Sequence, residues 1–301
     1  ADNLVRRSST RRLLGDYQGA IEDADQAIEL CTGREKFSLI LAEAMRAKGS
    51  TLFQQGKWKD SLHWLQQSLN IYQSCHRDQD IARIQVEIGA AADALGDFKQ
   101  AEKAYQDSLR YWQSVGDSMW QANLLNNLGV LQHSVGEYEL AFSNLEKALQ
   151  YASLNGNLRI EGYSLASIGD LYRDLEAYPE AEDAYQKAAQ IAKLIKDAYL
   201  YFYLRLSQGR VQIDQGHLRQ AVPILRSALQ MAKQNGSQNE FNKYRLENGF
   251  LHVFQGNFST AVDELSTAAE YFTAESHLDE LVRAQFLLAV SEFECGNRDK
   301  S

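Results

Sequence analysis

The sequence predicts an all-α solenoid, a right-handed superhelix of antiparallel helix pairs, because one short sequence motif recurs every forty residues. The motif consists of Gly, a polar residue, an aromatic residue or Leu, two variable residues and Ala. Its clear copies begin at Gly96, Gly136, Gly216 and Gly256, a weaker copy begins at Glu176, and altered copies begin at Gly56 and Gly15. A fixed period of this length is the signature of repeats that stack on their neighbours to share a core.

A second glycine marks the first helix of each pair. It lies seven residues before the recurring motif, at Gly49, Gly89, Gly129, Gly169, Gly209 and Gly249. A glycine inside a helix costs roughly 0.5–1 kcal/mol relative to alanine. Because this cost recurs at one register, we expect close approach of the two helices to compensate for it. Small residues of the second helix, such as Ala141 and Ala148, are predicted to face these glycines.

The second helix carries a larger side chain between its small residues, and a turn motif follows it at the end of the repeat. The large side chains are Tyr105, Leu145, Tyr185, Leu225 and Leu265. The turn motif is Gly followed by Asp, Asn or Ser, at residues 116–117, 156–157 and 236–237. This pattern predicts a helix that ends at the glycine and a polar side chain that caps the next helix.

The period divides the chain into one continuous array over residues 1–301. We expect a partial repeat at 1–36, full repeats at about 37–76, 77–116, 117–156, 157–196, 197–236 and 237–276, and a partial repeat at 277–301. The chain begins inside a first helix and stops at residues 298–301, where a second helix is expected to start. We therefore expect it to be a piece of a longer protein.

The pairing of a small residue late in one helix with Gly-x-aromatic-x-x-Ala at the start of the next resembles the tetratricopeptide repeat. The resemblance covers essentially the whole chain, although forty residues exceed the usual period of about thirty-four. Lengthened repeats of this kind are similar to those in the sensor arms of MalT-like bacterial transcriptional activators. They are also similar to those of the animal scaffold LGN and the kinesin light chain. The sequence pattern of residues 116–129 is similar to that of both groups.

The first group implies the sensor or regulatory arm of a larger bacterial transcription regulator. Binding of a ligand or partner would then control oligomerisation of an adjoining ATPase and DNA-binding apparatus. The second group implies a scaffold whose concave groove holds a partner peptide. Both remain open at this point.

Composition and motifs narrow the function further. The formal net charge is −9, whereas binding to nucleic-acid phosphates calls for clustered Lys and Arg, so direct nucleic-acid binding is not expected. Two Pro in 301 residues agree with an almost wholly helical chain, and three scattered Cys predict neither disulfides nor a zinc site. No common catalytic motif and no membrane span is found, so we expect a cytoplasmic, non-enzymatic protein without a cofactor.

The resemblance places first helices on the concave side of the array. Their inward residues then lie six and three positions before the helix glycine, and one and four after it. In the three central repeats this register selects a polar belt: Asn123, Asn126, His133, Tyr163, Asp170, Arg173, Tyr203 and Arg210. The C-terminal repeats are predicted to be largely apolar there.

Such a belt suits a small polar ligand or a peptide of a partner protein. Guanidinium groups bind carboxylates and phosphates through two parallel hydrogen bonds, so Arg173 and Arg210 are the predicted anchors. The alternative is a hydrated wall whose charges pair with one another, for example Asp170 with Arg173 or Arg210.

Overall fold

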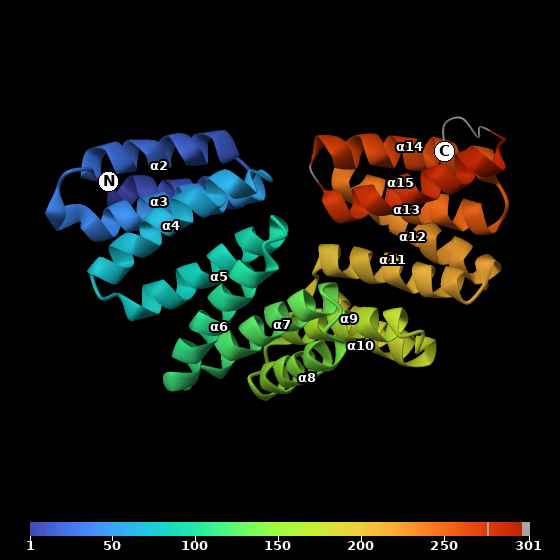
Figure 1. The fold of residues 1–301 in the computed structure, drawn as a ribbon, viewed down its shortest axis with the longest axis horizontal. Coiled ribbons are helices and arrows are strands. Elements are labelled where there is room, and N and C mark those ends of the chain that lie inside the picture. The colour runs from blue at the N-terminus through green and yellow to red at the C-terminus, as the bar shows by residue number, and fades with distance from the viewer. Residues whose placement is uncertain (276, 297–301) are drawn as a thin grey trace. The chain divides into compact units, whose positions relative to one another are not determined.

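The computed structural model describes residues 1–275 and 277–296, and all regular structure in that range is helical (Figure 1). The helices of the first half are α1 (Asp2–Leu13), α2 (Tyr17–Cys31), the short 3-10 helix η1 (Glu35–Phe37), α3 (Ser38–Gln54), α4 (Trp58–Ser74), α5 (Asp78–Ala94), α6 (Phe98–Ser114), α7 (Ser118–Ser134) and α8 (Tyr138–Leu154). Those of the second half are α9 (Leu158–Asp174), α10 (Tyr178–Ile195), α11 (Ala198–Asp214), α12 (Leu218–Asn235), α13 (Gln238–Phe254), α14 (Phe258–Ala274) and α15 (Leu278–Glu294). The predicted all-α repeat solenoid is therefore confirmed.

The helix contacts divide the chain into two compact units, Ala1–Asn157 and Leu158–Ser301, here called unit 1 and unit 2. Within each unit the odd-numbered α-helices are the first helices of the pairs and the even-numbered ones are the second. The boundary falls beside the repeat boundary predicted at residue 156. That residues 1–301 form one continuous array stays a prediction, and the helix expected at residues 298–301 lies outside the described residues.

The glycine inside each first helix gives room to the large side chain of the second helix, sixteen residues later. A Cβ atom added at Gly129 would lie 2.6 Å from Leu145 Cγ and 3.1 Å from the Ala141 carbonyl oxygen. At Gly89 the added atom would lie 2.5 Å from Tyr105 Cε1. The predicted close approach of the helices is confirmed. The surface that meets the glycine, however, includes the large side chain as well as the small residues expected there.

The turns between helix pairs have the predicted form, with a glycine after one helix and a polar cap before the next. Gly116 ends α6 with a φ of +72°, in the left-handed region where a side chain is strained. The Asp117 carboxylate then accepts hydrogen bonds from the backbone N–H groups of Met119 and Trp120, at 3.2 and 3.1 Å, and so caps α7. At the later turn the Ser237 hydroxyl accepts from the Glu240 N–H at 3.2 Å.

Glu176 stands where the other clear repeats carry glycine, and its φ is +58°. A non-glycine residue in this conformation costs about 1–2 kcal/mol. We therefore expect Glu176→Gly to raise the free energy of unfolding by roughly 0.5–1 kcal/mol, after the greater freedom of glycine in the unfolded chain is subtracted. Urea denaturation checks this, with Glu180→Gly in the first turn of α10 as a control that should lose stability. Equal or lower stability of Glu176→Gly would contradict the strain argument.

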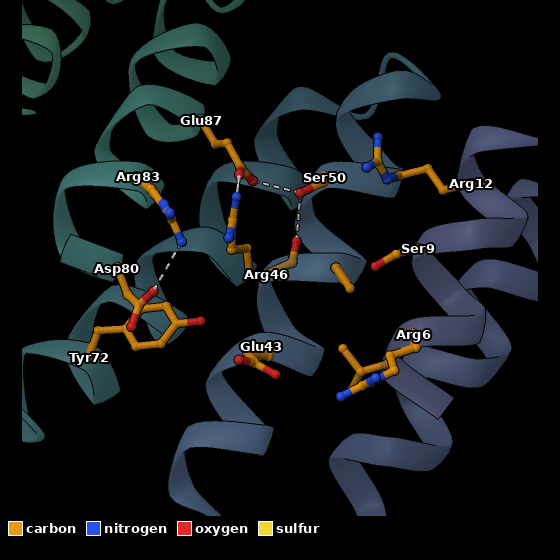
Figure 2. Close-up of a pocket in the computed structure, with 12 residues that line it drawn as sticks. Arg6, Ser9, Arg12, Glu43, Arg46, Ser50, Tyr72, Asp80, Arg83 and Glu87 are labelled. Carbon is orange, nitrogen blue, oxygen red and sulfur yellow. Dashed lines mark hydrogen bonds and ion pairs between the residues drawn. The ribbon is translucent and has the colours of Figure 1, made fainter. Parts of the chain in front are cut away.

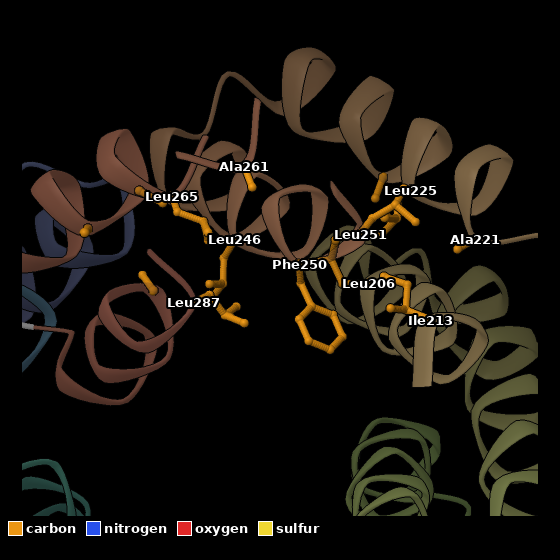
Figure 3. Close-up of a cluster of buried hydrophobic side chains, with 14 of the residues drawn as sticks. Leu206, Ile213, Ala221, Leu225, Leu246, Phe250, Leu251, Ala261, Leu265 and Leu287 are labelled. Atoms are coloured by element: carbon orange, nitrogen blue, oxygen red, sulfur yellow. The ribbon is translucent and has the colours of Figure 1, made fainter. Parts of the chain in front are cut away.

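The core of unit 2 between α11 and α15 is a continuous apolar cluster (Figure 3). Leu206, Leu246 and Leu287 extend from successive first helices into this cluster, and Leu225 and Leu265 fill it from the second helices. The fully buried Ala221 and Ala261 leave room between the helices. The polar side chains on the same first helices are therefore held on a rigid apolar base.

Two features of the described residues bear on function. No helix among them is long and apolar enough to cross a membrane. Within the same part of the chain, no group of three or more His, Cys, Asp and Glu side chains is placed to hold a metal ion.

Candidate functional site

Unit 2 contains a cavity of about 140 Å³ between the first helices α9, α11, α13 and α15. We call it the charged cavity. Its lining residues are Arg173, Tyr203, Leu206, Ser207, Arg210, Lys243, Leu246, Glu247, Glu280 and Arg283. Four of these side chains are cationic and two are carboxylates. Because ligand pockets for whole small molecules usually measure about 300–1,000 Å³, this cavity has the size for one chemical group of a ligand.

The repeat period brings these side chains together. Tyr203, Lys243 and Arg283 stand forty residues apart on successive first helices, and Leu206 and Leu246 follow the same spacing. Equal positions in stacked repeats lie next to each other. The two leucines also belong to the apolar cluster, so the cavity has an apolar floor and a polar wall.

Glu247 lies at the centre of the charge network, and its side chain is only 9% exposed. Its Oε1 atom accepts from Arg283 Nη2 at 2.8 Å, and its Oε2 atom lies 3.5 Å from Arg210 Nη1. Burial raises the pKa of this carboxyl, but Arg283 and Arg210 lower it by more, so that the pKa is below its usual value. Glu247 is therefore a buried carboxylate that stays ionised and holds two arginines in place.

The other cations are fixed in a similar way. Lys243 Nζ lies 2.8 Å from Glu280 Oε1. Burial lowers the pKa of Lys243, but Tyr199 and Glu280 raise it overall, so the amine stays charged. Arg210 Nε donates to Asp214 Oδ1 at 3.0 Å, and its guanidinium carbon lies 3.7 Å from the centroid of the Phe250 ring. This stacking on an aromatic ring is a cation–π contact.

Asp170 joins the cavity wall to the interior of the α9–α10 pair. It accepts hydrogen bonds from Tyr185 Oη at 2.7 Å and from Tyr203 Oη at 2.6 Å. Arg173 Nη1 lies 3.4 Å from the same carboxylate, and Arg173 Nη2 lies 2.9 Å from Asp174 Oδ1. Burial and the neighbouring Asp170 charge raise the pKa of Tyr203 well above 10.0, so the hydroxyl remains a donor.

This arrangement suits the binding of a small anion. The lining itself carries more cations than carboxylates. Asp170, Asp174 and Asp214, which orient Arg173 and Arg210, are not among the lining residues. A guanidinium has five N–H donors, so Arg173 and Arg210, which each lie beside two carboxylates, and Arg283, which is held by Glu247, keep donors for a further acceptor. The paired charges match the predicted alternative for Asp170 and Arg173, yet the same pairs also preorganise the cations.

The structure brings together part of the predicted polar belt. Arg173, Tyr203 and Arg210 line the charged cavity, and Asp170 is bonded to Tyr203. Tyr163, in contrast, is placed by Asp197, whose Oδ2 lies 3.4 Å from its hydroxyl, and by Arg159 near its ring.

The remaining members of the belt, Asn123, Asn126 and His133, lie on α7 in unit 1. There Asn123 Oδ1 lies 3.5 Å from Asn127 Nδ2, and the His133 ring lies 5.8 Å from the Tyr138 ring. Their role as binding residues stays a prediction.

Four charged lining residues were not among the predicted binding residues: Lys243, Glu247, Glu280 and Arg283. Because the register predicts a largely apolar concave side in the C-terminal repeats, it assigns no binding residue there. The large apolar residues Phe250 and Phe286 dominated that register, although Lys243 and Arg283 already stood at the position of Tyr203. Glu247 lies one helical turn after Lys243 and outside the four inward positions. A search for charge pairs across repeats would have found it.

Similar solved structures share this fold at low identity. A Rap protein complexed with competence and sporulation factor is 15% identical with a TM-score of 0.70, and the match covers 99% of this chain and 88% of that one. The apo quorum sensor NprR from B. thuringiensis is 18% identical with a TM-score of 0.70, covering 96% and 86%. NprR in complex with its cognate peptide NprX also matches, with a TM-score of 0.66, 18% identity and coverage of 93% and 85%.

A third protein similar to this chain is a signal transduction ATPase with numerous domains from Pyrococcus horikoshii, which has a tetratricopeptide repeat sensor. It is 16% identical with a TM-score of 0.63, and the match covers 92% of this chain and 43% of that one. No curated protein matches the sequence.

Family comparison agrees with the helix pairs seen in both units. One model described as tetratricopeptide repeat matches residues 1–74 and 80–153, and a second of the same description matches residues 163–195. Together these segments cover more than half of the sequence. The chain belongs to the tetratricopeptide repeat family.

Proposed function

We propose that this chain is a non-catalytic binding arm whose unit 2 captures an anionic group of a partner peptide in the charged cavity. The observation that carries the proposal is the convergence of Arg173, Arg210, Lys243 and Arg283 on one small cavity. Glu247 and Glu280 fix three of these cations before a ligand arrives. Preorganised charges lose less side-chain entropy on binding, which favours affinity.

The wider role that we propose is that of a sensor or regulatory arm in a larger bacterial transcription regulator. Structures similar to this chain include a quorum sensor, its complex with a cognate peptide, and an ATPase with a tetratricopeptide repeat sensor. These likenesses support a binding role for a tetratricopeptide array inside signalling proteins. The proposal expects the full-length gene to encode an ATPase with a P-loop and a helix-turn-helix segment. A complete gene without either would contradict it.

A binding experiment tests the charged cavity. We would titrate a blocked hexapeptide of alternating Ala and Glu, with an acetylated N-terminus and an amidated C-terminus, against the protein in a calorimeter. The same peptide with Gln in place of Glu is the uncharged comparison. We expect the acidic peptide to bind at least about tenfold more tightly, which corresponds to about 1.4 kcal/mol. Equal binding of both peptides would contradict an anion site.

Protein variants then locate the site. Arg283→Gln removes a cation whose side chain is 44% exposed, and we expect it to weaken the acidic peptide about tenfold. Lys187→Gln is the control, because its side chain is 59% exposed in the same unit and does not line the cavity. Asn126→Ala tests whether binding extends to the predicted belt of unit 1. An Arg283→Gln protein that binds like the parent would exclude the charged cavity as the site.

The competing function is a docking scaffold that holds a partner peptide through apolar contacts rather than through the charged cavity. One observation favours it: on α15 the apolar side chains of Val282 and Phe286 are 64% and 68% exposed. In that case Phe286→Ala would abolish binding of the partner peptide, and Arg283→Gln would leave it intact.

A further inference from the structure

Unit 1 contains a larger pocket, of about 470 Å³, between the first helices α1, α3 and α5 (Figure 2). Its lining includes four arginines from these three helices and three carboxylates from α3 and α5. None of its lining residues belongs to the charged cavity of unit 2. The volume lies in the range of pockets that hold a complete small ligand.

Part of the charge in this pocket is neutralised by well-made pairs. Arg46 Nε donates to Glu87 Oε1 at 2.7 Å, and the Ser50 hydroxyl donates to Glu87 Oε2 at 2.6 Å. On α1, Arg6 Nε lies 3.1 Å from Asp2 Oδ2. The Arg46, Ser50 and Glu87 contacts connect α3 with α5, whereas the Arg6–Asp2 pair is largely exposed, and each ion pair is neutral as a whole.

Two opposite charges in the pocket have no partner within the described residues. The Glu43 carboxylate makes no ion pair or hydrogen bond there, and neither does the Arg12 guanidinium. Arg83 is also weakly held, because its Nη1 lies 3.9 Å from Asp80, which accepts a closer bond of 2.9 Å from Arg77. The pocket therefore offers an unpaired carboxylate, which can bind a cationic group, and an unpaired guanidinium, which can bind an anionic group.

The two unpaired charges stand at different ends of the pocket. Figure 2 shows Glu43 near Arg6 and shows Arg12 at the end where Ser50 lies. Glu43 and Ser50 are seven residues apart on α3, a rise of about 10 Å along the helix. An extended chain of three residues spans about 10 Å. A tripeptide with its ammonium group at Glu43 therefore has the length to reach, along α3, the end of the pocket where Figure 2 shows Arg12.

We propose that this pocket binds a short zwitterionic peptide of about three residues with both termini free. Glu43 receives the terminal ammonium group, and Arg12 receives the terminal carboxylate, with the Ser9 hydroxyl on the same helix facing the pocket. Ligands that lack either charge leave one of these side chains unpaired and lose affinity. The inference does not depend on the charged cavity of unit 2.

Trialanine with free termini is the probe, compared with N-acetyl-trialanine and trialanine amide in calorimetric titrations at millimolar concentration. We expect each blocked form to bind at least about tenfold more weakly than trialanine itself. Absence of trialanine binding, or equal binding of all three peptides, would overturn the proposal.

Two variants connect the ligand charges to the residues. In Glu43→Gln we expect trialanine to weaken about tenfold, to the level of N-acetyl-trialanine, so that acetylation no longer matters. In Arg12→Gln we expect amidation to lose its effect in the same way. Neither variant breaks an ion pair, so both should fold, and a thermal melt verifies this. If the variants still discriminate between free and blocked peptides as the parent does, Glu43 and Arg12 are not the recognition groups.

Trialanine also carries a carboxylate, which the charged cavity of unit 2 would accept, so the whole trialanine series is repeated in the Arg283→Gln background. The effects of Glu43→Gln and Arg12→Gln on trialanine should persist there. If they disappear in that background, the unit 1 pocket is not the tripeptide site, whereas loss of acidic-hexapeptide binding in Arg283→Gln alone concerns the charged cavity.

Discussion

Replacing Glu247 with glutamine is expected to lower the free energy of unfolding of unit 2 by about 2–4 kcal/mol. The substitution keeps the shape of the side chain but leaves Arg210 and Arg283 without the carboxylate that lies between them. Breaking a fully buried pair from one side costs about 3–5 kcal/mol, because the remaining charge is uncompensated. The range expected for Glu247→Gln is lower than this, because the two arginines are partly exposed to solvent.

Guanidinium chloride denaturation of the parent and the variant measures this difference. Asp183→Asn is the matched control, because it removes an exposed pair with Lys187 in the same unit and should cost less than about 1 kcal/mol. The pH dependence gives a second check. Since the pKa of Glu247 is lowered from 4.5, its contribution is complete above that pH and is lost as the pH falls through the lowered value. The variant should lack this part of the acid sensitivity, and equal curves would contradict the assigned role.

Ala141→Leu is expected to destabilise unit 1 by about 1–3 kcal/mol through overpacking. Ala141 has no exposed surface, and its carbonyl oxygen lies 3.1 Å from the position of a Cβ atom on Gly129. The neighbouring Leu145 is also fully buried, so the added atoms have no open direction.

Thermal and chemical denaturation of the Ala141→Leu variant tests the register of the helix pairs. Leu140→Ala is the control, because Leu140 is 54% exposed on the same helix and its truncation should change stability by only about 0.5 kcal/mol. A variant that melts within about one degree of the parent would show that Ala141 does not lie at the tight contact.

The helix pairs could be predicted from the sequence because each signal acts over a short distance along the chain. Gly129 and Leu145 belong to one pair, and Asp117 caps the helix that it precedes. These contacts depend on local spacing and on the shape of single residues. The prediction for the helix glycines was incomplete. It placed only the small residues of the second helix against each glycine, whereas the large side chain, such as Leu145, also lies there.

The charged cavity could be predicted only in part, because its interactions join different repeats. Arg283 reaches Glu247 on the preceding first helix, and Tyr203 reaches Asp170 in the same way. A rule that selects four inward positions per helix finds Arg173, Tyr203 and Arg210 but cannot show which charges meet. It also misses Glu247, whose burial follows from packing between two helices rather than from its own position in the pattern.

The separation of sixteen residues between each helix glycine and its large side chain has a consequence for how the protein folds. The tightest contacts close short stretches of chain, so little loop entropy is lost before they form. Proteins that are rich in such local contacts fold quickly, and in repeat arrays folding starts in one repeat and spreads to its neighbours. Hydrogen exchange should therefore protect amides in steps of whole helix pairs, with fraying from the ends of a unit inward.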